Sequence, residues 1–204
     1  MELVFVTGNV NKMREIDDLL GDNFKLRNLN DLGFYGDIPE IHPTLEENAS
    51  AKSSYIYERF NVDCFADDIG LEVESLNNWP GVYSARFAEI EDNISFDSKK
   101  ERTEANIQKL FTLLKDKDSR KARFRTIISL IIQGEEFKFE GTVNGRITHE
   151  KRGKEGFGYD PVFVPDGYHK TFAELNLNEK NKISHRAIAF GKLVSFLKSR
   201  KDIR

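Results

Sequence analysis

The sequence predicts an α/β fold, in which helices pack on a central sheet, on three observations. Residues 3–6 are continuously apolar, as expected of a strand covered on both faces, and a glycine turn and a helix follow them. Residues 62–66 form a second buried strand, and residues 121–133 and 135–143 form two more. No linker or repeat interrupts the 204 residues. They therefore suit one large domain, or two lobes that share a sheet.

The composition excludes several classes of protein. Charged residues make up 32% and hydrophobic residues 39%, as in globular proteins, and the net charge of −3 argues against a surface that coats nucleic acid. The longest apolar run, residues 126–132, is too short to cross a bilayer, and no targeting segment is visible. The single cysteine, Cys64, predicts a reducing cytoplasm and an inert buried thiol.

The turn after the first strand is the first candidate site, and it precedes a helix with apolar residues on one face. Its residues are Thr7, Gly8, Asn9, Val10, Asn11 and Lys12. A strand, a glycine turn and a helix N-terminus together form an anion site of backbone amides. Lys12 opposes the helix dipole there, which is easier to explain if it meets a phosphate. The spacing is not that of a Walker loop, and an ordinary turn is the alternative.

Residues 31–43 predict a loop, and Glu40 within it is a carboxylate that could reach a metal. Thr44 and Glu47 have the spacing of a capping box at the start of the next helix, so Glu47 has a structural explanation. On the same helix, Asn48 and Lys52 are four residues apart and share one face. The supporting candidates of this region are Glu47, Asn48 and Lys52.

Asp67 and Asp68 follow the second apolar run, and the sequence predicts that they end the strand at the sheet rim before it resumes at Leu71. Two adjacent carboxylates raise each other's pKa unless a cation lies between them. Magnesium suits such a pair, because it prefers oxygen ligands and needs only one or two carboxylates beside substrate phosphates. An acidic turn is the alternative for this stretch alone.

Residues 77–86 predict a loop that carries Ser84 and Arg86, polar groups that could serve a ligand or solvate a rim. Residues 101–115 form a helix with a core-facing apolar stripe. Gly134 joins two strands, and Asn144-Gly145 predicts a hairpin turn.

The glycine-rich residues 153–160 surround two aromatic side chains, which can stack on a flat ligand where glycine lets the backbone approach. A hydrophobic plug on a turn is equally consistent with this pattern. The candidates here are Phe157, Gly158, Tyr159 and Asp160. Further on, Lys180 precedes Ser184, a predicted helix cap, and then His185 and Arg186. Three cationic or donor groups in this region suggest a ligand rich in acceptors.

These motifs, taken in order, resemble those of the inosine triphosphate pyrophosphatase (Ham1-like) family over nearly the whole chain. The matching blocks are Thr7-Gly8-Asn9 with Lys12, Glu46 to Ala49, Ala66 to Leu71, Pro80 to Arg86, Gly156 to Pro161, and Ser184-His185-Arg186. The resemblance implies a long mixed sheet flanked by helices, and one domain over residues 1–204 with two lobes around a central substrate cleft. It also implies a homodimer that binds a small nucleoside triphosphate.

The resemblance implies hydrolysis of deaminated purine nucleotides, namely inosine triphosphate (ITP), dITP and xanthosine triphosphate (XTP), to the monophosphate and pyrophosphate. Asp68 would be the catalytic acid, and Glu40, Asp68 and Asp67 would hold Mg²⁺. Residues 7–12 would hold the triphosphate, Phe157 would stack on the base with Gly158, Tyr159 and Asp160 beside it, and Lys180, His185 and Arg186 would contact the base.

This chain departs from the family at Ile69, where a serine is usual and a hydroxyl would help to hold phosphate or water. Trp79 also replaces a typically small residue before Pro80. Two other functions stay open at this point. One is a related pyrophosphatase for other modified nucleotides, and the other is a nucleotide-binding sensor without turnover, for which Ile69 is the only hint.

Overall fold

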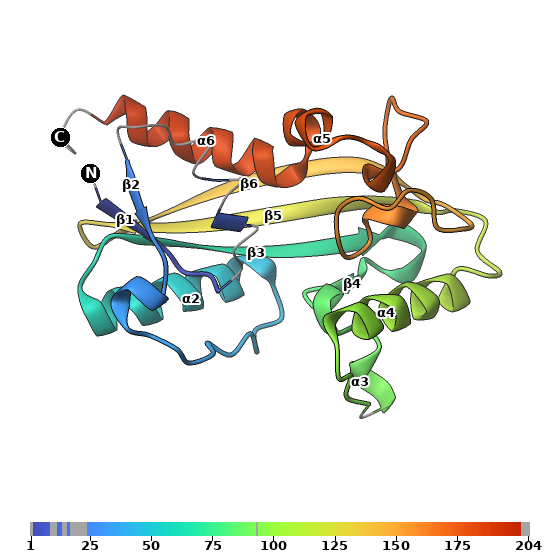
Figure 1. The fold of residues 1–204 in the computed structure, drawn as a ribbon, viewed down its shortest axis with the longest axis horizontal. Coiled ribbons are helices and arrows are strands. Elements are labelled where there is room, and N and C mark those ends of the chain that lie inside the picture. Colours follow the sequence, from blue (N-terminus) through green and yellow to red (C-terminus); the bar gives the residue numbers. More distant parts are fainter. Residues whose placement is uncertain (1, 9–11, 14–15, 17–23, 93, 201–204) are drawn as a thin grey trace. The chain divides into compact units, whose positions relative to one another are not determined.

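The computed structural model describes residues 2–8, 12–13, 16, 24–92 and 94–200 (Figure 1). The strands are β1 (Glu2–Phe5), β2 (Lys25–Arg27), β3 (Cys64–Val73), β4 (Trp79–Gly81), β5 (Lys121–Ile132), β6 (Glu135–Ile147) and β7 (Phe163–Pro165). The α-helices are α2 (Leu45–Phe60), α3 (Glu89–Asp92), α4 (Lys99–Leu113), α5 (Leu177–Ile183) and α6 (His185–Ser199).

The strands form one mixed sheet in the order β2-β1-β3-β5-β6-β7, with β4 paired to β3. β1 runs parallel to both β2 and β3, whereas β4 is antiparallel to β3, and β7 to β6. The predicted α/β class with a long mixed sheet is therefore confirmed.

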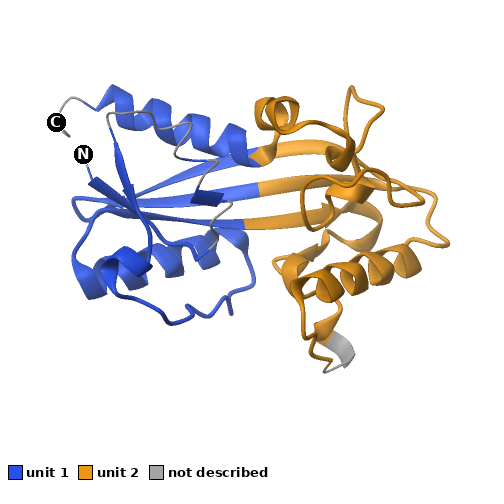
Figure 2. Ribbon diagram, viewed as in Figure 1, with its two compact units in different colours: residues 1–68, 126–141, 186–204 blue, residues 69–125, 142–185 orange. Residues whose placement is uncertain are grey.

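The chain divides into two compact units (Figure 2). Unit 1 comprises residues 1–68, 126–141 and 186–204, and unit 2 comprises residues 69–125 and 142–185. The polypeptide passes between the units within β3, β5 and β6, and again at the start of α6, between His185 and Arg186. Asp68 is thus the last residue of a unit 1 segment, and Ile69 is the first of a unit 2 segment.

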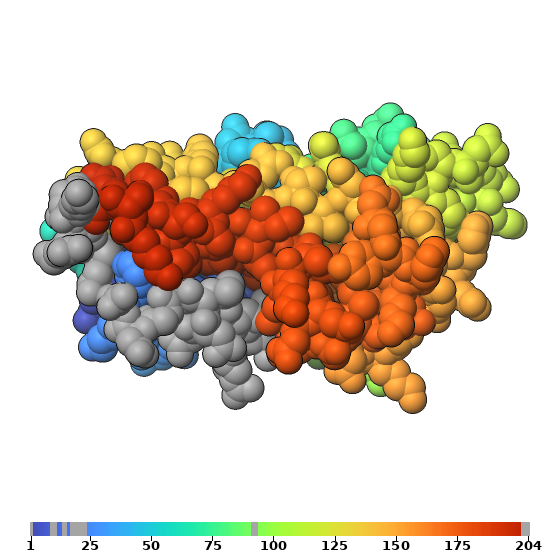
Figure 3. Space-filling view, turned by 90° about the horizontal axis from the view of Figure 1, so that it is seen from above, coloured from blue at the N-terminus to red at the C-terminus, as the bar shows by residue number. Residues whose placement is uncertain are grey.

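Unit 1 has helices on both faces of its strands. Alternate residues of β1 and β3 point to opposite faces, so the segments Leu3–Phe5 and Cys64–Ala66 are apolar on both faces. On one face Phe5 stacks on Phe65, at 4.5 Å between ring centroids, and both meet Phe190 of α6. On the other face Val4 packs with Ile56 of α2. The outer side of α6 (red) is part of the surface in Figure 3.

Unit 2 has its own core, built where α4 and the 3-10 helices pack on the strands. Its fully buried rings are Phe87, Phe163 and Phe172. The guanidinium of Arg120, the residue before β5, donates hydrogen bonds to the carbonyls of Leu114, Ile147 and Thr148. The predicted core stripe of α4 is confirmed by the burial of Ile107 and Leu110.

β3 differs from the prediction, because it does not end at the acid pair. Ten residues from Cys64 to Val73 form one strand, and Asp67 and Asp68 lie in its middle. Both acids are buried, with 2% and 7% of their surface exposed. Asp and Gly favour turns in isolation, but here lysine partners compensate the buried carboxylates and the strand continues.

The predicted hairpin turn at Asn144-Gly145 is also wrong. β6 continues through both residues to Ile147 and pairs with β7, with Gly145 opposite Pro165. A Cβ atom at Gly145 would lie 2.3 Å from the carbonyl oxygen of Val164, so the glycine permits a close approach of two strands instead of a turn. The turn predicted at Gly134 is confirmed, since Gln133 and Gly134 both have positive φ.

Several local predictions hold. The Thr44 hydroxyl accepts from the Glu47 amide and caps α2. Ser184 directly precedes α6, which begins at His185, and is the C-cap residue of α5; its capping of α6 stays a prediction. Cys64 is fully buried, and burial raises the pKa of its thiol to about 12, which makes it inert. In the described part of the chain, each helix is too short or too polar to cross a membrane.

Candidate active site

The centre of the site in unit 1 is the acid pair of β3, whose members face opposite sides of the strand. Lys12 donates to Oδ1 of Asp67 at 2.7 Å, and Lys52 of α2 donates to Oδ1 of Asp68 at 3.0 Å. Oδ2 of each aspartate is buried and accepts no hydrogen bond from any residue that the structure describes. Each acid thus offers one occupied and one unused oxygen.

Lys52 lies at the point where three oxygens converge. Its Nζ is 2.6 Å from Oε1 of Glu40, 2.6 Å from the carbonyl oxygen of Asp67 and 3.0 Å from Oδ1 of Asp68. Burial alone would lower the pKa of Lys52, but the carboxylates of Asp68 and Glu40 hold it above its ordinary value. The ammonium therefore stays charged and neutralises this acidic group.

The carboxyl groups of the pair have opposite pKa shifts. Burial raises the pKa of Asp68 to about 6, aided by Glu40 and opposed by Lys52. Burial also acts to raise the pKa of Asp67, but the charges of Lys12 and Lys52 outweigh it and hold the pKa below its usual range. Asp68 is therefore the member that can exchange a proton near neutral pH.

The same oxygens fit a hard divalent cation. The groups around the Lys52 ammonium are all oxygens, the donor type that Mg²⁺ prefers, and Asp68 also has a buried Oδ2 that accepts no hydrogen bond from the described residues. No three acid, histidine or cysteine side chains of the described ranges lie close enough to hold a metal by themselves. Mg²⁺ does not require such a set, because substrate phosphates and water complete its shell.

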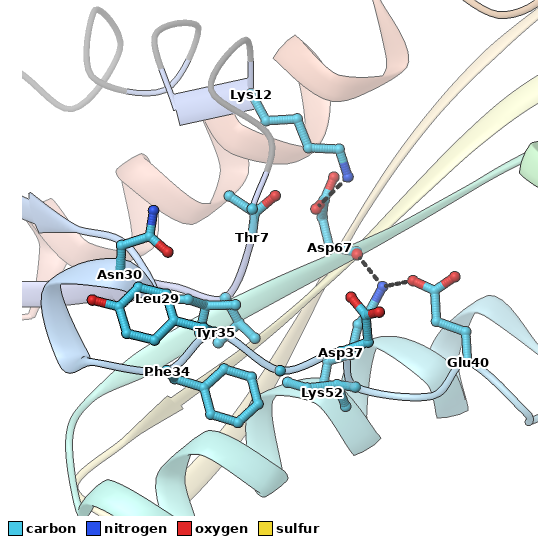
Figure 4. A pocket seen from close by; sticks show the side chains of 14 residues that line it. Thr7, Lys12, Leu29, Asn30, Phe34, Tyr35, Asp37, Glu40, Lys52 and Asp67 are labelled. Carbon is cyan, nitrogen blue, oxygen red and sulfur yellow. Dashed lines mark hydrogen bonds and ion pairs between the residues drawn. The ribbon is translucent and has the colours of Figure 1, made fainter. Parts of the chain in front are cut away.

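A cavity of about 290 Å³ in unit 1 opens next to this cluster (Figure 4). Thr7, Gly8 and Lys12 of the predicted phosphate turn line it, together with Lys52 and Asp67. Asn9, Val10 and Asn11, the other predicted members of the turn, lie outside the described residues. Burial lowers the pKa of Lys12, and its ion pair with Asp67 opposes this effect.

The supporting candidates of α2 have different positions. Glu47 stays at the exposed helix start, where it accepts from the Thr44 hydroxyl at 2.8 Å, so its role is in the cap. Asn48 is buried and brackets the backbone of His42, accepting from its amide and donating to its carbonyl. Asn48 thereby fixes the segment that carries Glu40.

The glycine-rich loop of unit 2 forms a second cluster. Asp160 is buried and accepts from the Phe157 amide at 2.8 Å and from Lys180 at 2.6 Å. The Lys180 ammonium also lies 5.1 Å from the centroid of the Phe157 ring. Gly156 leaves room for this arrangement, since a Cβ there would be 2.1 Å from Oδ2 of Asp160. The three candidates Phe157, Asp160 and Lys180 are thus brought together, and Gly158, with φ of 60°, continues the loop.

Tyr159 and Ser84 are committed to internal bonds. The Tyr159 hydroxyl donates to the carbonyl of Ser84 at 3.0 Å, and only 5% of the residue is exposed. The Ser84 hydroxyl accepts from the Leu71 amide and donates to the Gly81 carbonyl. Both residues therefore position the loops around them. The third candidate of this region, Arg86, lies over the ring of Tyr83.

His185 and Arg186 are both buried at the start of α6. The His185 ring stacks on Phe124 in unit 2, at 4.8 Å and 17°. Arg186 belongs to unit 1, where its charge lowers the pKa of both Lys12 and Asp67. Ile69, the residue in place of the usual serine, is half-buried in β3.

Sequence reasoning missed two parts of this site. Lys52 was expected only as a supporting residue, although it is the counter-charge of the whole acidic group; its four-residue spacing from Asn48 was the only signal. Apart from Glu40, the cavity lining from the segment between β2 and α2 was not predicted. It includes Asn30, Phe34 and Tyr35, and a loop without periodicity gave no indication of which face it presents.

Comparisons with known proteins cover nearly the whole chain. The model of the Ham1 family matches residues 3–196. The dITP/XTP pyrophosphatase of Christiangramia forsetii is 48% identical over 197 residues, which are 97% of this chain and 99% of that protein. The dITP/XTP pyrophosphatase of Aquifex aeolicus is 43% identical over 211 residues, covering 98% of both. Among solved structures, the Ham1 protein of Staphylococcus aureus has 37% identity and a TM-score of 0.87, covering 98% of this chain and 100% of that one.

Proposed function

The chain belongs to the Ham1 family, and from this premise we propose that it is a pyrophosphatase for dITP, ITP and XTP. The reaction releases the nucleoside monophosphate and pyrophosphate and so removes deaminated purines from the nucleotide pool. The relatives above, full-length and more than 40% identical, carry the name of this activity. The observation in the structure that supports it best is the buried acid pair with its two lysines.

In this proposal Asp68 is the catalytic carboxylate. Its Oδ1 is held by Lys52, so its unused Oδ2 accepts the proton of the water that attacks the α-phosphorus. A pKa of about 6 suits a base that works near neutral pH. The bond from the α-phosphorus to the bridging oxygen breaks, and pyrophosphate leaves with that oxygen.

The phosphates are held by Lys12, Lys52 and the turn that begins at Thr7; of this turn the described residues Thr7, Gly8 and Lys12 line the cavity of unit 1, as does Lys52. Glu40, Asp67 and Asp68 would hold Mg²⁺, which when bound neutralises phosphate charge. Lys12 and Lys52 are paired with these three carboxylates, so bound Mg²⁺ would supply the positive charge, and the two ammonium groups would add hydrogen-bond donors for phosphate oxygens.

The base is recognised by residues of the glycine-rich loop and by the donors around α6. The Phe157 ring offers a stacking face, and Lys180, fixed by Asp160, presents an ammonium beside that ring. The carbonyl at position six of hypoxanthine and xanthine accepts from donors such as His185 or Arg186. Adenine carries an amino group there and would leave buried donors unpaired, which can discriminate by about 10⁴ to 10⁵.

We further propose a single domain with two lobes, a cytoplasmic location and a homodimer. The lone buried cysteine agrees with a reducing compartment. Sedimentation at several protein concentrations tests the dimer.

Two other functions are less favoured. Ile69 replaces the usual serine but leaves the carboxylates and lysines intact, which argues against a sensor without turnover. A pyrophosphatase for other modified nucleotides is the other alternative.

The test is pyrophosphate release from ITP, dITP, XTP, GTP and ATP, with Mg²⁺ and with EDTA. We expect rapid release from the first three with Mg²⁺, little from GTP or ATP, and none with EDTA. Release from a modified pyrimidine nucleotide but not from ITP would favour the alternative pyrophosphatase. ITP that binds without turnover would favour the sensor.

A further inference from the structure

The cavity of unit 1 has two chemically different ends (Figure 4). At one end lie the charged side chains of Lys12, Lys52, Asp37, Glu40 and Asp67. At the other end, which we call the aromatic end, are residues from the segment between β2 and α2. The aromatic end consists of Leu29, Asn30, Phe34 and Tyr35. The phosphates of the proposed substrate need only the charged end.

Tyr35 displays an aromatic ring to solvent at the cavity wall. It is 82% exposed although it lines the cavity. The neighbouring Phe34 is buried and packs edge to face on Tyr55 and Phe60 of α2, at 5.8 and 6.3 Å between centroids. The backbone of Tyr35 is thereby anchored while its ring stays open, and an exposed ring on a fixed support is a stacking platform for a base.

Asn30 adds an exposed polar group to the aromatic end. A 3-10 turn fixes its backbone, with the Gly33 amide donating to its carbonyl at 2.9 Å and its own amide donating to the Asn28 side chain at 2.8 Å. Its amide side chain lines the cavity and can both donate to and accept from a base or ribose. A flat ring and a polar anchor at one end, with two lysines at the other, match a nucleoside joined to a phosphate chain.

We propose that the aromatic end binds the distal nucleoside of a dinucleoside polyphosphate, so that this protein also cleaves dinucleoside triphosphates that carry one deaminated purine. The proposal rests on the proposed function, because the deaminated base still selects the phosphorus that is attacked. A group attached to the terminal phosphate would extend from the charged end into the aromatic end of the same cavity, where it would contact Tyr35.

The step is the same hydrolysis with a larger leaving group. In inosine-triphosphate-adenosine, with the nucleosides joined through their 5′ oxygens, water attacks the phosphorus next to inosine and Asp68 takes its proton. The bond from that phosphorus to the bridging oxygen breaks, and ADP leaves with the oxygen. The products are IMP and ADP, and no redox partner is needed.

The experiment measures the products and kcat/KM for inosine-triphosphate-adenosine and for ITP with Mg²⁺. Wild-type protein should give IMP and ADP, without AMP and IDP. Tyr35→Ala should lower the ratio of the two kcat/KM values about tenfold, since stacking on an aromatic ring contributes at about this scale. Tyr35→Phe keeps the ring and should hold the ratio within about twofold. Tyr168→Ala removes a tyrosine that is 39% exposed and is not among the cavity lining, so it should leave the ratio unchanged.

Two results would overturn the proposal while leaving the proposed function intact: ITP is cleaved but the dinucleotide is not, or Tyr35→Ala does not change the ratio. If ITP itself is not cleaved, the proposed function fails. The dissociation constants in EDTA then decide on the distal site. If the dinucleotide binds more tightly than ITP, and Tyr35→Ala abolishes this difference, the distal site is supported. If the two ligands bind equally, the distal site is ruled out.

Discussion

Replacing Asp68 with Asn is expected to lower kcat for ITP by about 10²- to 10⁴-fold, the usual contribution of a general base. Asn keeps the shape of the side chain but cannot take the proton of the attacking water, and it is a poorer metal ligand. Steady-state kinetics at pH 8 with saturating Mg²⁺ measures the effect. Asp116→Asn, a change at an exposed acid, is the matched control and should leave kcat unchanged.

The same substitution is expected to stabilise the protein at high pH. Because burial raises the pKa of Asp68 to about 6, the folded state holds the proton more tightly than the unfolded chain. Ionised Asp68 therefore lowers the free energy of unfolding above pH 6. This loss disappears as the pH falls through the pKa of Asp68 in the unfolded chain, near 4. Asn avoids it, so the free energy of unfolding should rise by about 2–3 kcal/mol at pH 8 and by about 1 kcal/mol at pH 4.5.

Urea denaturation at the two pH values tests this expectation. A variant that is inactive but less stable than wild type at pH 8 would mean that Asp68 stabilises the fold. In that case its loss of activity would no longer indicate a catalytic role. Retained activity would contradict the mechanism directly.

Replacing Lys52 with Met is expected to lower the free energy of unfolding by about 3–5 kcal/mol in EDTA, the scale for a buried ion pair that loses one partner. The ammonium compensates Glu40 and Asp68, and without it two carboxylates lie together with no counter-charge. Mg²⁺ should recover part of the loss, because a bound cation supplies the missing charge. Denaturation with EDTA and with Mg²⁺ measures both effects.

Lys25→Met is the control for this experiment. Its ion pair with Glu2 spans 3.4 Å, and its side chain is 76% exposed, so its loss should leave the free energy of unfolding nearly unchanged. Equal stability of Lys52→Met and wild type in EDTA would show that Lys52 is not the counter-charge. A large loss that Mg²⁺ does not reduce would argue against a metal at this position.

The elements with clear periodicity were predictable from the sequence. β1, α4 and the strands around Gly134 lie where the apolar spacing placed them, since burial of one face determines such segments. β3 was predicted to break because Asp67, Asp68 and Gly70 resemble a turn. What keeps the strand intact is charge compensation by Lys12 and Lys52, which are 55 and 16 residues away from their partners and give no local signal.

In the candidate site, too, features with a local sequence motif were predictable, and features that depend on distant partners were not. Motif residues such as Asp160 and Lys180 were expected together, and they form an ion pair. The central position of Lys52 could not be predicted, because it depends on where α2 packs on β3. The role of Tyr159 was also not predictable, since its hydroxyl is directed to the Ser84 carbonyl, 75 residues away in sequence. The sequence around Tyr35 has no periodicity, so its position at the cavity wall could not be predicted.

Hydrolysis of ITP in water enriched with oxygen-18 identifies the phosphorus that the water attacks. Mass spectrometry of the products locates the label. Attack at the α-phosphorus puts one labelled oxygen into IMP and none into pyrophosphate, and this is the result that we expect. Label in pyrophosphate, or release of inorganic phosphate with IDP, would place the attack elsewhere on the chain of phosphates and contradict the proposed reaction.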